Sequence, residues 1–117
     1  MRIIARGTLR AFVRNRVEIR HQRVAGEHLD AWFALASRAE WKSSAELKAM
    51  FRTASIVSRE RVVFNIMGND YGLVVAVDYS HSVVLILWVG THAEYDKVVV
   101  YTVEFERERY ANSANSQ

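Results

Sequence analysis

Apolar positions recur along the chain with two different periods. Before residue 60 they follow helical spacing, and one set lies at i, i+3, i+4 and i+7: Leu29, Trp32, Phe33 and Ala36. This set predicts an amphipathic helix that ends near Ala39, with Gly26 near its start or in a break before it. From Arg61 onward the apolar residues form short runs of β-branched and aromatic side chains, which are typical of strands. The chain therefore predicts a helical first half and a sheet-forming second half.

Three further elements are expected in the first half: a short strand "RIIA" at 2–5, a helix over 7–15, and a short helix within "SSAELKAMF" at 43–51. Ser43 or Ser44 can cap this short helix, with Glu46 in its first turn. On the helix over 7–15 and just before it, arginines recur at i, i+4 spacing: Arg6, Arg10 and Arg14.

The second half predicts three strands in an antiparallel meander: "RVVFNIM" at 61–67, "YGLVVAVDY" at 71–79 and "VVLILWV" at 83–89. Gly68 and Asn69 form a plausible two-residue hairpin turn between the first two. In the middle strand Leu73, Val75 and Val77 share one face with two tyrosines, and Gly72, Val74 and Ala76 share the other. The outer strands are apolar on both faces. The helices are therefore expected to cover one face and another body, such as a bound partner, to shield part of the other.

Length and composition indicate one soluble domain. The 117 residues contain no cysteine, which excludes a disulfide framework, a thiolate zinc site and a cysteine nucleophile. The apolar runs are far shorter than the ~20 residues that span a bilayer. A reducing compartment such as the cytoplasm is expected. The four histidines show no metal-ligand spacing, so neither a metal nor another cofactor is expected.

Charge divides the chain unevenly. Residues 1–61 carry 13 Lys or Arg against 6 Asp or Glu, whereas residues 62–117 carry 3 against 7. Most of the basic residues are arginines, whose planar fork of donors suits phosphate groups. A basic half is compatible with a nucleic-acid partner, although a solvated helix face explains such a charge run equally well.

The stretch "GTHAEYDKV" at 90–98 has a structural reading. Thr91 and Glu94 have the spacing of a capping box, which satisfies backbone donors at a helix start. Glu94 can also pair with Lys97 at i, i+3. In this reading His92 and Tyr95 are surface residues of a short helix.

The same stretch has a catalytic reading. A helix that begins at His92 places Tyr95 on the same face. An imidazole, a phenol and the ammonium of Lys97 around a phosphate are groups that metal-free RNA cleavage needs, because protons must be moved and charge must be stabilised. The residues alone leave both readings open.

Five segments together resemble the HigB family of toxins from type II toxin–antitoxin systems, within the RelE/ParE-like superfamily: "MRIIARGTLRAF" at 1–12, "AWF" at 31–33, "EWKSSAELKAMFRTASIV" at 40–57, "RVVFNIMGNDYGLVVAVDY" at 61–79 and "GTHAEYDKV" at 90–98. The resemblance runs in order over most of residues 1–103. It implies one α+β toxin domain over 1–103, with a polar extension at 104–117. The implied fold is RelE-like, an antiparallel sheet with N-terminal helices on one face and a concave basic surface on the other.

The resemblance also implies an activity and partners. The activity is metal-independent cleavage of mRNA, usually on the translating ribosome. The partner is a HigA-like helix-turn-helix antitoxin, through which the toxin contacts DNA only indirectly, and no membrane is involved. Matching positions imply catalytic roles for His92, Tyr95 and Lys97. Arg61, Asn65 and Asn69 match the strand-hairpin segment and are implied to bind RNA or phosphate, and Trp88 beside them is a candidate base-stacking residue.

The chain departs from the family pattern where that pattern carries basic residues. Asp70, Gly72 and Ala76 stand at such positions, and Leu87 and Trp88 make the last strand apolar. Each lost phosphate contact lowers electrostatic affinity for RNA. Two functions therefore stay open: a ribosome-dependent endoribonuclease, and a weakened toxin-fold protein that binds antitoxin, ribosome or RNA without efficient cleavage. A relative that acts on gyrase is a third, less favoured, alternative.

Overall fold

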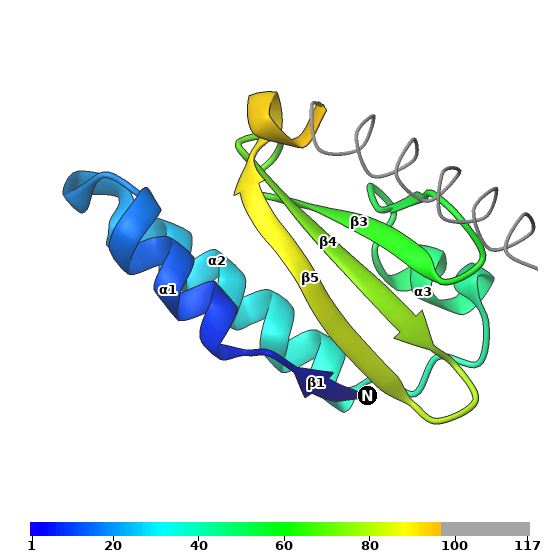
Figure 1. Cartoon of the computed structure of the whole chain (residues 1–117). Coiled ribbons are helices and arrows are strands. Elements are labelled where there is room, and N and C mark those ends of the chain that lie inside the picture. Colours follow the sequence, from blue (N-terminus) through cyan, green and yellow to red (C-terminus); the bar gives the residue numbers. More distant parts are fainter. Residues whose placement is uncertain (97–117) are drawn as a thin grey trace, which may run out of the picture.

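A computed structural model of the chain describes residues 1–96, which form one sheet with helices packed against it (Figure 1). The elements in chain order are β1 (Arg2–Ile4), α1 (Gly7–Arg16), α2 (Ile19–Arg38), α3 (Ser44–Met50), β2 (Ser55–Ile56), β3 (Arg61–Ile66), β4 (Tyr71–Asp78) and β5 (Val83–Thr91). Residues 92–96 continue directly from β5 as a short helix. The α+β class predicted from the sequence is confirmed.

The sheet has the strand order β1-β5-β4-β3-β2. Strands β3, β4 and β5 form the predicted antiparallel meander, and β2 adds antiparallel to β3. At the opposite edge β1 runs parallel to β5, with Ile4 beside Leu85, so the sheet is mixed. A parallel neighbour needs a long crossover connection, and helices α1 and α2 begin the one that joins β1 to the meander.

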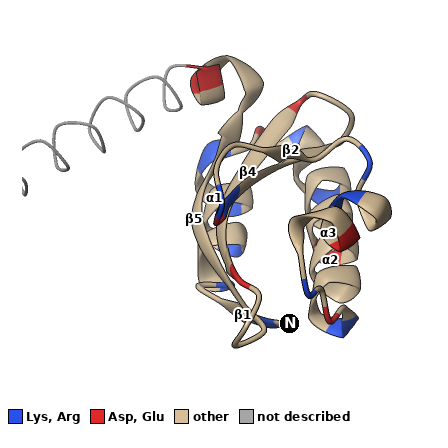
Figure 2. Cartoon of the chain, turned by 90° about the vertical axis from the view of Figure 1, so that its right-hand side faces the viewer, with Lys and Arg blue, Asp and Glu red and all other residues tan. Residues whose placement is uncertain are grey.

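The helices pack on one face of the sheet, and α2 and α3 lie on the same side of it in Figure 2. The core between them contains an aromatic group centred on Phe64, which is 1% exposed. Its ring lies 5.0 Å from that of Phe51 and 5.3 Å from that of Trp32, both in edge-to-face geometry, and is stacked 6.4 Å from Trp41. Such pairs add to the stabilisation from burial.

Two local predictions were wrong. Gly26 lies inside α2, neither at its start nor in a break, because the buried stripe continues on both sides of it through Ala25 and Leu29. A glycine inside a helix costs only ~1 kcal/mol relative to alanine, which such burial offsets. The β3–β4 connection has four residues, 67–70, and not two. Met67 and Gly68 both have positive φ there, at 53° and 66°.

The predicted alternation of β4 is confirmed, since Leu73, Val75 and Val77 point into the core. The register between β4 and β5 shifts between Val74 and Val75, which pair with Trp88 and Ile86 and leave Leu87 of β5 as the extra residue. On the face opposite the helices, the register partners Ile4 and Leu85 remain 39% and 38% exposed.

That face is not the basic surface implied by the family resemblance. Among the strand residues that the structure describes, only Arg2 and Arg61 are basic, and β4 and β5 contain no Lys or Arg. Figure 2 accordingly shows β5 without charged residues. The positive charge lies on the helices and loops of the first half. None of the helices in residues 1–96 combines the length and the apolar character needed to cross a membrane.

Candidate functional site

The short helix that follows β5 begins with the predicted capping box. The Glu94 amide donates to the Thr91 hydroxyl oxygen at 3.2 Å, and the Thr91 hydroxyl and amide donate to the Glu94 carboxylate at 3.0 and 3.4 Å. These bonds satisfy backbone donors that a helix start leaves without intrahelical partners. The chain direction after β5 is therefore fixed at the point where His92 and Tyr95 follow.

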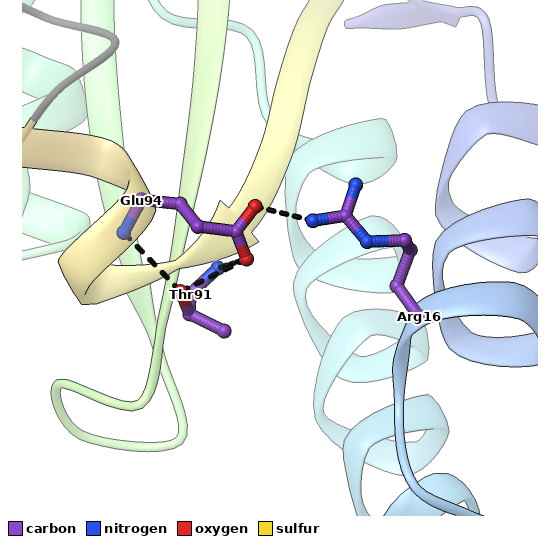
Figure 3. A network of polar contacts seen from close by, with 3 residues as sticks. All are labelled: Arg16, Thr91 and Glu94. Carbon is purple, nitrogen blue, oxygen red and sulfur yellow. Dashed lines mark hydrogen bonds and ion pairs between the residues drawn. The ribbon is translucent and has the colours of Figure 1, made fainter.

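A third residue joins this cap from the other end of the chain. Arg16, in the last turn of α1, donates to the Glu94 carboxylate and forms an ion pair with it (Figure 3). Burial raises the pKa of Glu94, but the hydrogen bonds from Thr91 and Arg16 together with the Arg16 charge outweigh it and hold this pKa below 4.5. Glu94 is therefore ionised at neutral pH. Its predicted pairing with Lys97 lies outside the described residues.

His92 and Tyr95 lie against one another on the short helix. Their ring centroids are 5.6 Å apart and the ring planes meet at 67°, an edge-to-face arrangement. The His92 amide donates to the Asp70 carbonyl at 3.1 Å, which ties the helix start to the β3–β4 loop. Both side chains are half-buried, so each ring is partly open to solvent.

Two paired glycines, Gly72 and Gly90, lie on the sheet face at this end and are called the Gly72–Gly90 floor. Gly72 of β4 and Gly90 of β5 are direct cross-strand partners on the face opposite the core. A Cβ on Gly72 would lie 3.4 Å from Cβ and Cγ of Tyr95, and a Cβ on Gly90 only 2.3 Å from Cζ2 of Trp88. The Trp88 ring therefore occupies the space that a side chain on Gly90 would fill, whereas Tyr95 lies at contact distance from such a Cβ on Gly72. This arrangement brings Trp88 to the same end of the sheet as Tyr95.

Of the other predicted site residues, Asn65 and Asn69 lie near His92 and Tyr95, whereas Arg61 lies farther along β3. Asn65 is the β3 partner of Gly72 and so lies beside this floor, where its side-chain amide donates to the Thr53 carbonyl at 3.0 Å. Asn69 is exposed in the β3–β4 loop, next to the Asp70 carbonyl that His92 contacts. Arg61 begins β3 opposite Ala76, four residues from Asn65, or roughly 13 Å along the strand. Lys97 lies outside the described residues.

The environment of Tyr95 favours its neutral form. Burial, followed by the negative charge of Asp96, raises the pKa of Tyr95 above 10.0. The phenol is therefore protonated at neutral pH and can donate a proton or a hydrogen bond. The imidazole of His92, which lies edge to face with this phenol, has ring nitrogens that donate or accept hydrogen bonds. The pair thus combines a proton donor with a group able to accept a proton.

Residues 62–96 carry a net negative charge, and Asp78 among them lies at the end of β4 away from the site. Residues 62–96 contain four carboxylates, Asp70, Asp78, Glu94 and Asp96, and no Lys or Arg. The arginine row of the first half instead lines a groove of about 420 Å³ between α1 and α2, together with Leu9, Val13 and Leu29. Within residues 1–96 no group of three or more His, Asp or Glu side chains is placed to hold a metal ion.

Comparison with known families agrees with this architecture. Residues 25–98 match the family model HigB_toxin, described as the RelE-like toxic component of a toxin–antitoxin system. The match covers more than half of the chain, and it defines the class of the protein as a toxin of a toxin–antitoxin system. Within that class, the chain belongs to the HigB toxin family. A search of curated proteins gave no significant match. Membership of the family implies an antitoxin partner.

Three residues of this site were not predicted from the sequence: Gly72, Gly90 and Arg16. Gly72 stands at a position where the family pattern is basic, although a glycine inside a strand is also a signal of close packing. Gly90 lay within the quoted motif without a role. Arg16 gave no local signal, because its partner Glu94 is 78 residues away.

Proposed function

We propose that this HigB-family protein is a metal-independent mRNA endoribonuclease that acts on the translating ribosome and thereby inhibits translation. The observation that supports this proposal most directly is the His92–Tyr95 ring contact at the end of β5, beside the Gly72–Gly90 floor. It places two proton-transfer groups together at a site where the helix start is held by three residues.

Cleavage of RNA without metal requires two proton movements. A base removes the proton of the 2′-hydroxyl, the 2′-oxygen attacks the phosphorus, and the bond from phosphorus to the 5′-oxygen breaks. An acid protonates that leaving oxygen, so the products are a 2′,3′-cyclic phosphate and a 5′-hydroxyl. Tyr95, whose pKa is raised by burial, keeps its proton at neutral pH and is assigned the acid role, and His92 is assigned the role of base. Each such group typically contributes ~10²–10⁴-fold to the rate. Lys97 and Arg61 are assigned to the charge on the scissile phosphate.

The partners follow from the same proposal. The antitoxin is a HigA-like helix-turn-helix protein that neutralises the toxin and carries the contact with DNA. The exposed Ile4 and Leu85 on the sheet face opposite the helices are the kind of apolar surface that a protein partner covers. The place of action is the cytoplasm, where mRNA and ribosomes meet.

A second function is favoured by one observation, the absence of Lys and Arg from residues 62–96. RNA phosphates bind mainly through basic side chains, and each missing contact lowers affinity. On this alternative the protein keeps the toxin fold and binds antitoxin, ribosome or RNA without efficient cleavage.

Mapping of new mRNA 5′ ends after induction without antitoxin distinguishes the two. The endoribonuclease produces growth arrest and new ends within translated regions, and both are lost in His92→Ala and strongly reduced in Tyr95→Phe. The binding protein produces few or no new ends. Persistence of the cuts in both variants contradicts the assigned site.

Matched control variants are available. His21→Ala removes an exposed histidine of α2. Tyr79→Phe removes a hydroxyl whose pKa is also raised by burial, at the far end of β4. Both controls are expected to leave the cuts unchanged. Products that end in a 2′,3′-cyclic phosphate and a 5′-hydroxyl support the metal-independent step.

A further inference from the structure

The five glycines of the chain fall into two groups by what lies beside them. A Cβ on Gly7, Gly26 or Gly68 would meet no atom within 4 Å. A Cβ on either member of the cross-strand pair Gly72–Gly90 would meet an aromatic side chain. The two glycines that support rings are thus neighbours on one face of the sheet, with Cα atoms roughly 5 Å apart.

The rings above this pair remain accessible. Trp88 and Tyr95 are half-buried, and His92 meets Tyr95 edge to face. We call Trp88, Tyr95 and His92, with the two glycines beneath them, the aromatic patch. The other two tryptophans, Trp32 and Trp41, are each 3% exposed in the core. The patch therefore holds the tryptophan that a ligand can reach.

The charges around the patch do not suit phosphate. Residues 62–96 supply four carboxylates and no Lys or Arg. Arg16, which reaches the helix of the patch from α1, is engaged by Glu94. Arg61, at the start of β3, pairs with Ala76, which lies four residues along β4 from Gly72. Within residues 62–96 this aromatic surface has no adjacent Lys or Arg, which favours a ligand that has a π-face of its own.

We propose that the aromatic patch binds an unpaired nucleobase of single-stranded RNA by stacking, and that stacking, not phosphate charge, supplies most of the RNA affinity of this site. The proposal rests on the proposed function for the choice of RNA as the ligand. Base–aromatic stacking tolerates any base, because every base has a π-face. The glycines at 72 and 90 leave room for the Tyr95 and Trp88 side chains at this end of the sheet. The site thus presents aromatic side chains where the family pattern has basic residues.

Tryptophan fluorescence of the full chain tests this proposal. The probes are a short 2′-O-methyl RNA, which cannot be cleaved through its 2′-oxygen, and an oligomer of the same length with abasic residues. The base-containing oligomer is expected to quench the emission of Trp88, and the abasic oligomer to bind about tenfold or more weakly. Raising salt from about 50 to 200 mM is expected to change the Kd less than tenfold, since few phosphates are neutralised. Equal binding of both oligomers, a steeper salt dependence, or no binding of either overturns the proposal.

Two variants separate stacking from folding. Trp88→Leu keeps an apolar side chain without a ring, and is expected to lose the quenching and about tenfold in affinity. Trp88→Phe keeps a ring and is expected to recover most of the affinity. Circular dichroism and Tm show whether each variant is folded. Equal affinity of the folded Leu and Phe variants overturns the proposal.

The outcome is distinguishable from failure of the proposed function. If His92→Ala still cuts mRNA but Trp88 is quenched by base-containing RNA, the catalytic assignment fails and the stacking proposal holds. If mRNA is cut through His92 but abasic and base-containing oligomers bind equally, the catalytic assignment holds and the stacking proposal fails.

Discussion

Arg16, at the C-terminal end of α1, pairs with Glu94, which lies 78 residues later and caps the helix that carries His92 and Tyr95. The pair links the first helix of the domain to the candidate site through side chains (Figure 3). Its role is to hold the helix start against α1, so its loss is expected to affect the position of the site more than the stability of the fold.

Arg16→Ala is the direct test of that role. The two side chains are 54% and 38% exposed, so the variant is expected to lower the free energy of unfolding by less than ~1 kcal/mol. Displacement of the helix start is expected to reduce mRNA cleavage by about tenfold, which corresponds to ~1.4 kcal/mol in the barrier. Arg20→Ala, which breaks the exposed Arg20–Glu18 pair, is the control and should leave cleavage unchanged. Equal activity of the two variants contradicts a positioning role for Arg16.

Acid is expected to weaken the same link. The pKa of Glu94 in the folded protein lies below its usual 4.5, so its carboxylate stabilises the fold fully above pH 4.5 and this contribution is lost as pH falls through the lower folded value. The difference in unfolding free energy between the wild type and Glu94→Gln should therefore be constant above pH 4.5 and shrink below it. Denaturant titrations at a series of pH values measure this difference. A difference that instead shrinks as pH rises contradicts the lowered pKa.

Gly90→Ala is expected to displace Trp88. The new Cβ would lie 2.3 Å from Cζ2 of that residue, so the indole must move. The expected cost is ~1–3 kcal/mol of unfolding free energy, with a change in tryptophan fluorescence and near-UV circular dichroism.

Gly26→Ala is the matched control for this change. It adds a Cβ in open space inside α2, and is expected to stabilise the fold by ~0.5–1 kcal/mol. Unaltered fluorescence in Gly90→Ala shows that the indole does not rest on this glycine.

The cap of α3 provides a test that separates two adjacent serines. The Ser43 hydroxyl accepts from the Glu46 amide at 3.3 Å, and Glu46 in turn accepts from the Lys42 amide at 2.7 Å. Ser43→Ala is therefore expected to destabilise the protein by ~1 kcal/mol, whereas Ser44→Ala, inside the helix, should be close to neutral. Thermal unfolding measures both, and a larger loss for Ser44→Ala contradicts the cap assignment.

Features set by neighbours in sequence were predictable. The Thr91–Glu94 box and the Ser43 cap each depend on residues three apart, and the alternation of β4 depends on residues two apart. Such spacings specify local geometry because helices and strands have fixed periods. The proximity of His92 and Tyr95 was predictable for the same reason, because residues three apart on a helix share a face.

Features set by distant contacts were not predictable in this way. The parallel pairing of β1 with β5 and the Arg16–Glu94 pair depend on how the chain crosses the sheet. Gly72 was interpreted as a missing cation, because its actual neighbour, Tyr95, reaches it only after β5 has turned into the short helix. The position of Gly26 inside α2 shows the related limit that tertiary burial overrides local helix propensity.

The parallel contact between β1 and β5 also constrains when the domain can be completed during synthesis. Ile4 can pair with Leu85, and Arg16 with Glu94, only after β5 and the short helix that follows it have left the ribosome. Contacts of such long sequence separation form late and slow folding. A nascent chain therefore assembles its candidate site only after nearly the whole domain has emerged. A chain whose sheet is still being synthesised therefore cannot use this site.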